Sequence, residues 1–141
     1  MIVVDTGFLF ALVDKRDVWH ERARAQVATA SEGWVTTWPV LTEATHLMTR
    51  WLGIEFAAAL MDDVAAGGLA LWEPPAAQWP RIAPLMRKYA KLPMDLADAS
   101  LLLLAEHLGH GRILSTDERD FRTYRWKNRK PFHNLLAGGG T

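Results

Sequence analysis

Four acidic residues stand where the sequence changes from apolar to polar. Asp5 directly follows the first β-branched run of the chain, and Asp117 comes just after the last such run. Glu43 and Asp98 lie in the first turns of two segments with helical spacing. Carboxylates that converge without basic partners repel one another, and hard oxygen ligands select Mg²⁺ or Mn²⁺. A bound divalent cation can lower the pKa of a water molecule and steady a phosphoryl oxygen, so the pattern favours metal-assisted chemistry on phosphates.

Each acid also has a simpler interpretation. Asp5 is placed to cap the helix that follows it, while Asp95 and Asp98 suit a helix cap and its first turn. Asp117 fits an ordinary turn. Taken singly, such residues are more often structural than catalytic, so the catalytic hypothesis depends on all four acids meeting at one place.

The elements that must bring them together follow from hydrophobic periodicity. Short β-branched runs alternate with helical patterns, which predicts a single three-layer α/β/α domain with a mostly parallel sheet of four or five strands. Ligands bind at the carboxyl edge of such a sheet, and the acids are expected there. The predicted strands cover residues 2–4, 34–37, 69–72 and 112–115, and the predicted helices cover residues 8–13, 20–30, 39–51, 54–66, 76–91 and 95–107.

The composition limits the class of protein. A chain of 141 residues, half of them hydrophobic, fits one domain, expected over residues 1–135 with a flexible Gly-rich tail over 136–141. Equal numbers of basic and acidic residues, 16 of each, exclude a polybasic or an acidic solvating chain. The absence of cysteine excludes disulfide scaffolds and zinc ribbons and fits a reducing cytoplasm. No apolar run is long enough for a membrane span or a signal peptide, so no membrane partner is expected.

Charge is concentrated in one segment near the C-terminus. Residues 119–130 carry six basic residues and a single acid, Asp120. Two interpretations are about equally favoured: a surface that follows a phosphate backbone, and a solvated edge strand with protective charges. Tyr124, Trp126 and Phe132 interleave with the basic residues and are candidates for stacking on unpaired nucleotides. The six basic residues, taken as candidate RNA-binding residues, are Arg119, Arg122, Arg125, Lys127, Arg129 and Lys130.

Five motifs along the chain together resemble those of a known family. Its opening, IVVDTGFLFALVD over residues 2–14, resembles that of PIN-domain proteins, especially VapC-type toxins, and so does DVWHERA over 17–23. Three later motifs continue the resemblance in the same order: LTEA over 41–44, MDLADASL over 94–101 and ILSTDERDF over 113–121. Each motif alone is loose, but the ordered set runs over residues 1–135 and is fairly specific.

The resemblance implies a Mg²⁺- or Mn²⁺-dependent endoribonuclease with a PIN-like fold. It implies that Asp5, Asp98 and Asp117 hold the metal, directly or through water, and that Glu43 positions or deprotonates the attacking water. Asp120 would be an auxiliary acid and Thr116 a polar neighbour of the site. Asp98 is preferred to Asp95 as the third acid, because it matches the Asp-Ala of the motif while Asp95 suits a helix cap. Gly7 stands where many relatives carry Ser.

The resemblance also implies partners and leaves alternative functions open. An RNA substrate, a small cognate antitoxin and a homodimer are expected in the cytoplasm. A PIN nuclease of housekeeping RNA processing would carry the same residues and lack the antitoxin. A Mg²⁺-binding phospho-receiver is the alternative from another class, although Glu73-Pro74-Pro75 after the third strand fits its phospho-acceptor badly. Several tryptophans are interpreted as core or interface residues: Trp19, Trp38, Trp51, Trp72 and Trp79.

Overall fold

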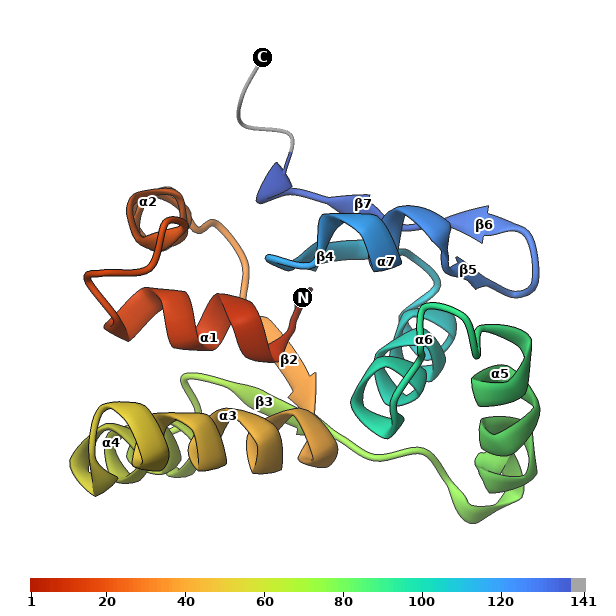
Figure 1. Ribbon diagram of the computed structural model, residues 1–141, viewed down its shortest axis with the longest axis horizontal. Helices are drawn as coiled ribbons and strands as arrows, with labels where there is room; N and C mark the ends of the chain where they lie inside the picture. Colours follow the sequence, from red (N-terminus) through yellow and green to blue (C-terminus); the bar gives the residue numbers. More distant parts are fainter. Residues whose placement is uncertain (138–141) are drawn as a thin grey trace.

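A five-stranded parallel sheet forms the middle of the molecule (Figure 1). The computed structural model describes residues 1–137. The strands lie in the order β3-β2-β1-β4-β7, and every neighbouring pair in this sheet is parallel. The sequence prediction of a mostly parallel sheet is therefore confirmed. The strands are β1 (Ile2–Val4), β2 (Trp34–Thr37), β3 (Ala70–Trp72), β4 (Arg112–Leu114) and β7 (His133–Asn134).

Helices cover both sides of the sheet, which confirms the three-layer arrangement. The helices that connect β1 to β2 and β2 to β3 pack against one another: α1 contacts both α2 and α3, and α3 contacts α4. Helices α5 and α6 lie on the other side of β1 and β2 (Figure 1). The α-helices are α1 (Thr6–Val13), α2 (His20–Ala28), α3 (Trp38–Trp51), α4 (Ile54–Ala65), α5 (Ile82–Lys88), α6 (Leu96–Leu108) and α7 (Glu118–Thr123).

The predicted helix over 76–91 is two elements in the structure. A 3₁₀-helix, η1 (Ala76–Arg81), contains Pro80, and α5 begins only after it. Proline has no amide hydrogen and its ring crowds the preceding turn, which explains why a regular α-helix does not run through Pro80. Pro84 lies in the first turn of α5, where the amide hydrogen that proline lacks would have no partner within the helix.

The core runs along β1, β4 and the helix before β4. Val3, Val4, Ile113 and Leu114 are fully buried on the two central strands. In α6 the run of residues 101–104 is buried on all sides, because this helix is covered by the sheet and by α5. Over residues 1–137 no helix is both long and apolar enough to pass through a lipid bilayer.

The C-terminal segment differs most from the sequence interpretation. After α7 the chain forms a small antiparallel hairpin from β5 (Arg125–Trp126) and β6 (Lys130–Pro131), and β7 then joins the main sheet beside β4. Tyr124, Trp126 and Phe132 are at most 8% exposed and belong to the core. The prediction that they stack on nucleotides is wrong, because this segment buries its aromatic side chains to close the end of the sheet.

The expected flexible tail is only partly within the described residues. Leu136, which the sequence placed in the tail, is 1% exposed and packs in the core. Residues 138–141, the rest of the Gly-rich stretch, lie outside the described residues.

Candidate active site

The acids meet where the order of the strands reverses direction. From β1 the chain proceeds to β2 and β3 on one side, and it later returns to β4 on the other side of β1. Ligand sites of open α/β sheets lie at such a switch point, beyond the carboxyl ends of the strands. This strand order also differs from the 2-1-3-4-5 order of receiver domains, which excludes the phospho-receiver alternative.

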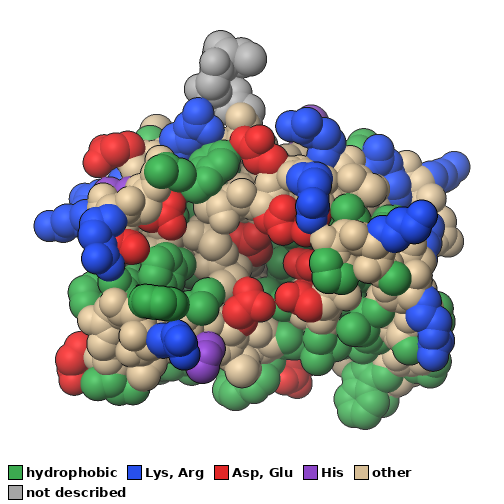
Figure 2. Space-filling model, viewed as in Figure 1, with side chains coloured by type: hydrophobic (Ala, Val, Ile, Leu, Met, Phe, Trp, Pro, Cys, Tyr) green, Lys and Arg blue, Asp and Glu red, His purple; other side chains and the backbone are tan. Residues whose placement is uncertain are grey.

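A cavity of about 320 Å³ occupies this position. Figure 2 shows acidic side chains gathered in the middle of this face, with basic side chains farther out toward its edges. All four acids that the sequence singled out line the cavity, and two more join them. The polar residues lining it are Asp5, Thr6, Glu43, Asp95, Asp98, Thr116, Asp117 and Asp120.

Asp5 is held by both of its carboxylate oxygens. Oδ1 accepts a hydrogen bond of 3.0 Å from the Phe8 amide, which makes Asp5 the N-cap of α1. Oδ2 accepts from the Ser115 hydroxyl. The register explains this second contact, because Val4 pairs with Leu114 and the next residues therefore lie side by side. Burial raises the pKa of Asp5 to about 6, and the charges of Asp117 and Glu43 add to the effect.

Asp98 lies in the first turn of α6, whose N-terminus points to the same edge of the sheet. Asp95 is the N-cap and accepts a 2.8 Å hydrogen bond from the Asp98 amide, while Asp98 Oδ2 accepts at 3.4 Å from the Asp95 amide. Oδ2 also accepts a 3.0 Å hydrogen bond from the Tyr124 hydroxyl. The pKa of Asp98 is raised to about 7, mainly by burial and next by repulsion from Asp95.

Asp117 and Asp120 belong to the turn that opens α7. Asp117 caps this helix through a 3.3 Å hydrogen bond from the Asp120 amide, and its own amide donates to the Ser115 hydroxyl at 2.9 Å. Burial raises the pKa of Asp117 to about 6, and its contact with Asp120 is the next cause. Asp120 is buried and accepts a 3.0 Å hydrogen bond from Arg119 Nε.

Glu43 and Thr116 complete the wall of the cavity. Glu43 is half-buried in the second turn of α3, where Pro39 in the first turn helps to begin the helix. Thr116 lies directly against Gly7: a Cβ atom on Gly7 would stand 1.9 Å from the Thr116 hydroxyl oxygen. The threonine hydroxyl thus fills the space in which a larger residue at position 7 would carry its side chain.

The chemistry of these donors fits a hard divalent cation. Three neighbouring carboxylates have raised pKa values, because burial and mutual repulsion disfavour their charged forms. A cation between them would relieve that repulsion. Within residues 1–137 no three acidic or histidine side chains already stand as a complete ligand set, so a bound cation would require carboxylates to turn toward it. Each of Asp98 and Asp117 has one oxygen that accepts no hydrogen bond within this part of the chain.

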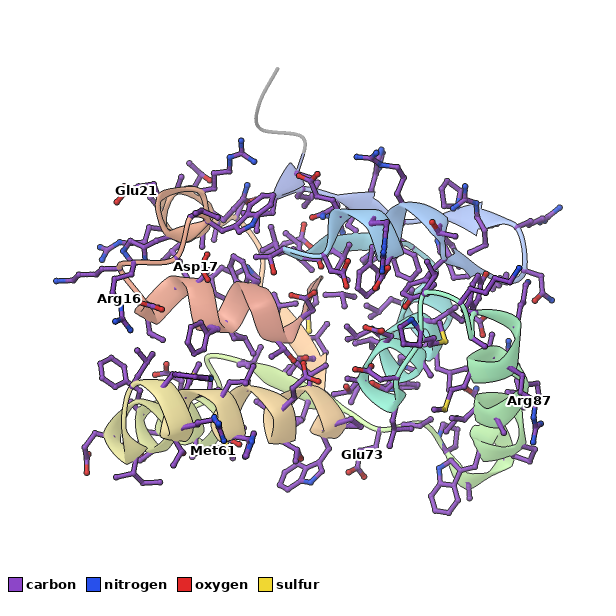
Figure 3. The ribbon with its side chains drawn as sticks, viewed as in Figure 1. Arg16, Asp17, Glu21, Met61, Glu73 and Arg87 are labelled. Atoms are coloured by element: carbon purple, nitrogen blue, oxygen red, sulfur yellow. The ribbon has the colours of Figure 1, made fainter. Side chains whose placement is uncertain are left out.

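Other acids remain outside the cluster. Glu73 follows β3 as Asp5 follows β1, yet it is exposed and does not line the cavity. Figure 3 shows Glu73 pointing outward beyond β3, and Asp17 and Glu21 near α2, away from the central cavity. Lying after a strand is therefore not sufficient, and only the two strands at the switch point bring their acids together.

The basic segment of the sequence divides into two groups. Arg125 Nη1 donates to the carbonyls of Arg122, Thr123 and Tyr124 and so closes the end of α7. Arg119 donates to Asp120 and to the Leu92 carbonyl. These two guanidinium groups are engaged in holding the fold. The other four are on the surface of α7 and the hairpin, with Lys130 half-buried: Arg122, Lys127, Arg129 and Lys130.

Sequence reasoning missed two hydroxyl groups that touch the acids. Ser115 donates to Asp5, and Tyr124 donates to Asp98. Ser115 had a local signal, since it ends the strand paired with β1. Tyr124 had no local sequence signal, because its contact with Asp98 depends on how α7 and β5 pack against α6.

Comparisons with known proteins agree with this fold. The family model described as PIN domain matches residues 2–127. Ribonuclease VapC26 of Mycobacterium tuberculosis is 25% identical over 124 residues, which cover 88% of this chain and 92% of that protein. The crystal structure of Mycobacterium tuberculosis VapC20, described as a sarcin-ricin loop cleaving toxin, superposes with a TM-score of 0.77 at 20% identity and covers 84% of this chain and 92% of that one. With the family model spanning nearly its whole length, this chain belongs to the PIN domain family.

Proposed function

We propose that this PIN-domain protein is a divalent-metal-dependent endoribonuclease and the toxin of a toxin–antitoxin pair. The observation that carries the proposal is the cluster of carboxylates around the switch point, from four separate elements of the fold. A relative named as a ribonuclease and a structural neighbour titled as a sarcin-ricin loop cleaving toxin support the same reaction class.

In this proposal Asp5, Asp98 and Asp117 hold Mg²⁺ or Mn²⁺, directly or through water. The metal would supply a more acidic bound water and charge neutralisation at the scissile phosphate. Asp5 is fixed from both sides and sets the position of the site relative to the sheet. Asp98 and Asp117 present their unengaged oxygens, and Asp120 adds negative charge next to Asp117.

Glu43 is proposed as the residue that orients and deprotonates the attacking water. It comes from α3, on the opposite wall of the cavity from the α7 turn, and it accepts no hydrogen bond within residues 1–137 that would hold it in another role. Thr116 would contribute a hydroxyl beside the site.

An RNA substrate also requires positive charge, because a carboxylate cluster repels the phosphate backbone. We assign this role to the four basic side chains that are not engaged in closing α7 or in binding Asp120: Arg122, Lys127, Arg129 and Lys130. Lys127 and Lys130 lie over the Trp126 ring, which holds both ammonium groups on the surface of the hairpin.

A small antitoxin and a second copy of the chain are the proposed protein partners, in the cytoplasm. An apolar cavity of about 360 Å³ between α1, α3 and α4 offers a place for apolar antitoxin side chains. Trp38, Trp51 and Trp79 are more than half exposed, which supports interfaces rather than core positions for these tryptophans. Light scattering at micromolar concentration tests the homodimer, and a mass equal to one chain would contradict it.

The decisive experiment for the reaction is induced expression with mapping of cleaved cellular RNA, followed by cleavage with purified protein. We expect RNA cleavage with Mg²⁺ or Mn²⁺, little cleavage of DNA, and loss of activity with Asp5→Asn. Undiminished cleavage in excess EDTA would contradict the metal-dependent mechanism. If none of the proteins encoded by neighbouring genes suppresses the activity, a housekeeping nuclease is the better interpretation.

A further inference from the structure

Tyr124 is buried in an unusual place for a tyrosine. Its side chain is fully buried between Tyr89 and Phe121, with ring centroids 5.0 and 5.2 Å away. Its hydroxyl crosses from the α7–β5 junction to α6 and donates a 3.0 Å hydrogen bond to Asp98 Oδ2. A buried hydroxyl needs a partner, and here that partner is a carboxylate of the candidate active site.

The hydrogen bond selects one oxygen of Asp98. Both donors that reach this carboxylate, the Tyr124 hydroxyl and the more distant Asp95 amide, bond to Oδ2. Oδ1 accepts no hydrogen bond among the described residues, and Asp98 is one of the residues that line the cavity. Without the hydroxyl, only the 3.4 Å contact within the capping box would restrain the rotation of this carboxylate.

We propose that Tyr124 is a positioning residue, which holds the Asp98 carboxylate so that Oδ1 is presented to the cation. This inference rests on the proposed function and deepens it by adding a residue that does not touch substrate. Outer hydrogen-bond partners of metal ligands fix the orientation of those ligands and typically change metal affinity by about 10- to 100-fold. Tyr124 also joins the C-terminal hairpin to the site, since its backbone follows α7 directly.

The test is the affinity of the purified protein for Mn²⁺, measured by electron paramagnetic resonance. Tyr124→Phe keeps the aromatic ring and removes only the hydroxyl. The matched control is Tyr89→Phe, because Tyr89 packs against the same ring and its hydroxyl accepts from the Arg125 amide at 3.1 Å rather than contacting an acid. We expect Mn²⁺ binding about tenfold weaker in Tyr124→Phe and unchanged within twofold in Tyr89→Phe.

Two further measurements separate positioning from general loss of structure. At a temperature well below the Tm of the variant in EDTA, where the protein is folded without metal, cleavage by Tyr124→Phe should recover as Mn²⁺ is raised. In the Asp98→Asn background, Tyr124→Phe should have no additional effect on Mn²⁺ binding, since its contact acts through that carboxylate.

The outcomes distinguish this inference from the proposed function. Wild-type protein that binds Mn²⁺ and cleaves RNA, together with equal Mn²⁺ affinity in Tyr124→Phe, would overturn the positioning role alone. Equal weakening in Tyr124→Phe and Tyr89→Phe would overturn it as well, because packing and not the hydroxyl would then be responsible. Wild-type protein that binds no Mn²⁺ would overturn both.

Discussion

Asp5, Asp95 and Asp117 each cap a helix at the edge of the candidate site. In the proposed site, Asp5 and Asp117 would both cap a helix and hold the metal, whereas Asp95 would only cap its helix. Asp98 is different, because it is the N3 residue of its helix, it lines the cavity, and its Oδ1 accepts no hydrogen bond within residues 1–137. The simple structural interpretation of the acids is thus correct for their backbone contacts, and it does not compete with a catalytic role.

The pair Asp95 and Asp98 gives the sharpest test of the site assignment. Asp98→Asn should lower RNA cleavage by about two orders of magnitude or more, because it removes a charged ligand. Asp95→Asn should be mild, since Asn caps a helix nearly as well as Asp. Single-turnover cleavage rates measure both, and the reverse ranking would make Asp95 the third acid.

The raised pKa values predict how the stability of the metal-free protein depends on pH. Asp98, with a pKa of about 7 in the folded protein, holds its proton more tightly there than in the unfolded chain, where its pKa is 3.8. Its contribution to the free energy of unfolding therefore falls as pH rises from about 4 to 7 and is constant above that range. Burial is the main cause of this raised pKa; the charges of Asp95 and Asp117 raise it further, and the hydrogen bond from Tyr124 lowers it.

Asp98→Asn should accordingly stabilise the metal-free protein at pH 8. We expect a gain on the order of 1–2 kcal/mol, discounted for solvent access and equal to a few degrees in Tm, that disappears near pH 4. Thermal melts in EDTA across this range provide the measurement. Comparing the two proteins cancels the opposing effect of His110, whose lowered pKa costs stability as pH falls below 6.5. A difference independent of pH would show that Asp98 carries no buried charge.

At the level of elements, the first turn of α1 is packed against the turn after β4. This contact requires a residue without a side chain at position 7, because the Thr116 hydroxyl already occupies that space. Gly7→Ala should therefore destabilise the protein by about 1–3 kcal/mol, or move Thr116 away from the site. In the Thr116→Ala background, Gly7→Ala should cost less, since the clash with the hydroxyl is gone. A double-mutant cycle of Tm values tests this, and equal costs in the two backgrounds would contradict it.

Local patterns predicted most of the elements and the four principal acids of the cluster. β1, β2, β3 and β4 are short apolar runs bounded by polar residues, and the helices between them have regular apolar spacing, so each could be recognised within its own segment. The clustering of the acids follows from these elements, because all strands of a parallel sheet end at the same edge.

The C-terminal segment could not be predicted in the same way. Its strands have two residues each, and the hairpin turns through Lys127 and Asn128 with positive φ angles of 49° and 63°. Such strands are stabilised by tertiary packing, here of Trp126 and Phe132, and not by any periodicity. The roles of Ser115 and Tyr124 depend on strand register and on packing between distant segments, which no local pattern reports.

On the scale of the whole molecule, a net charge of zero conceals strong segregation of charge. The acids fill the central cavity, while the basic residues of α7 and the hairpin stand beyond it (Figure 2). A chain of phosphates could be drawn to the edge of the site by these basic residues and reach the acids only where a cation neutralises them. The structure also changes which basic residues should be tested, since Arg119 and Arg125 hold the fold.

Arg122 and Arg129 are the better probes of RNA binding, because both are exposed and neither makes more than one surface ion pair: Arg122 lies 3.8 Å from Glu118. If both contact phosphates, Arg122→Ala with Arg129→Ala should weaken RNA binding and reduce the slope of log affinity against log salt by about 1.4, at roughly 0.7 for each single-strand contact. Arg16→Ala with Arg24→Ala removes the same charge from exposed positions around α2 and should leave the slope unchanged. The measurement is a salt titration of an Asp5→Asn protein on a short RNA, so that no cleavage occurs. Equal slopes for the two double variants would mean that the basic residues beyond the cavity are a solvated surface, and that RNA reaches the acids by another path.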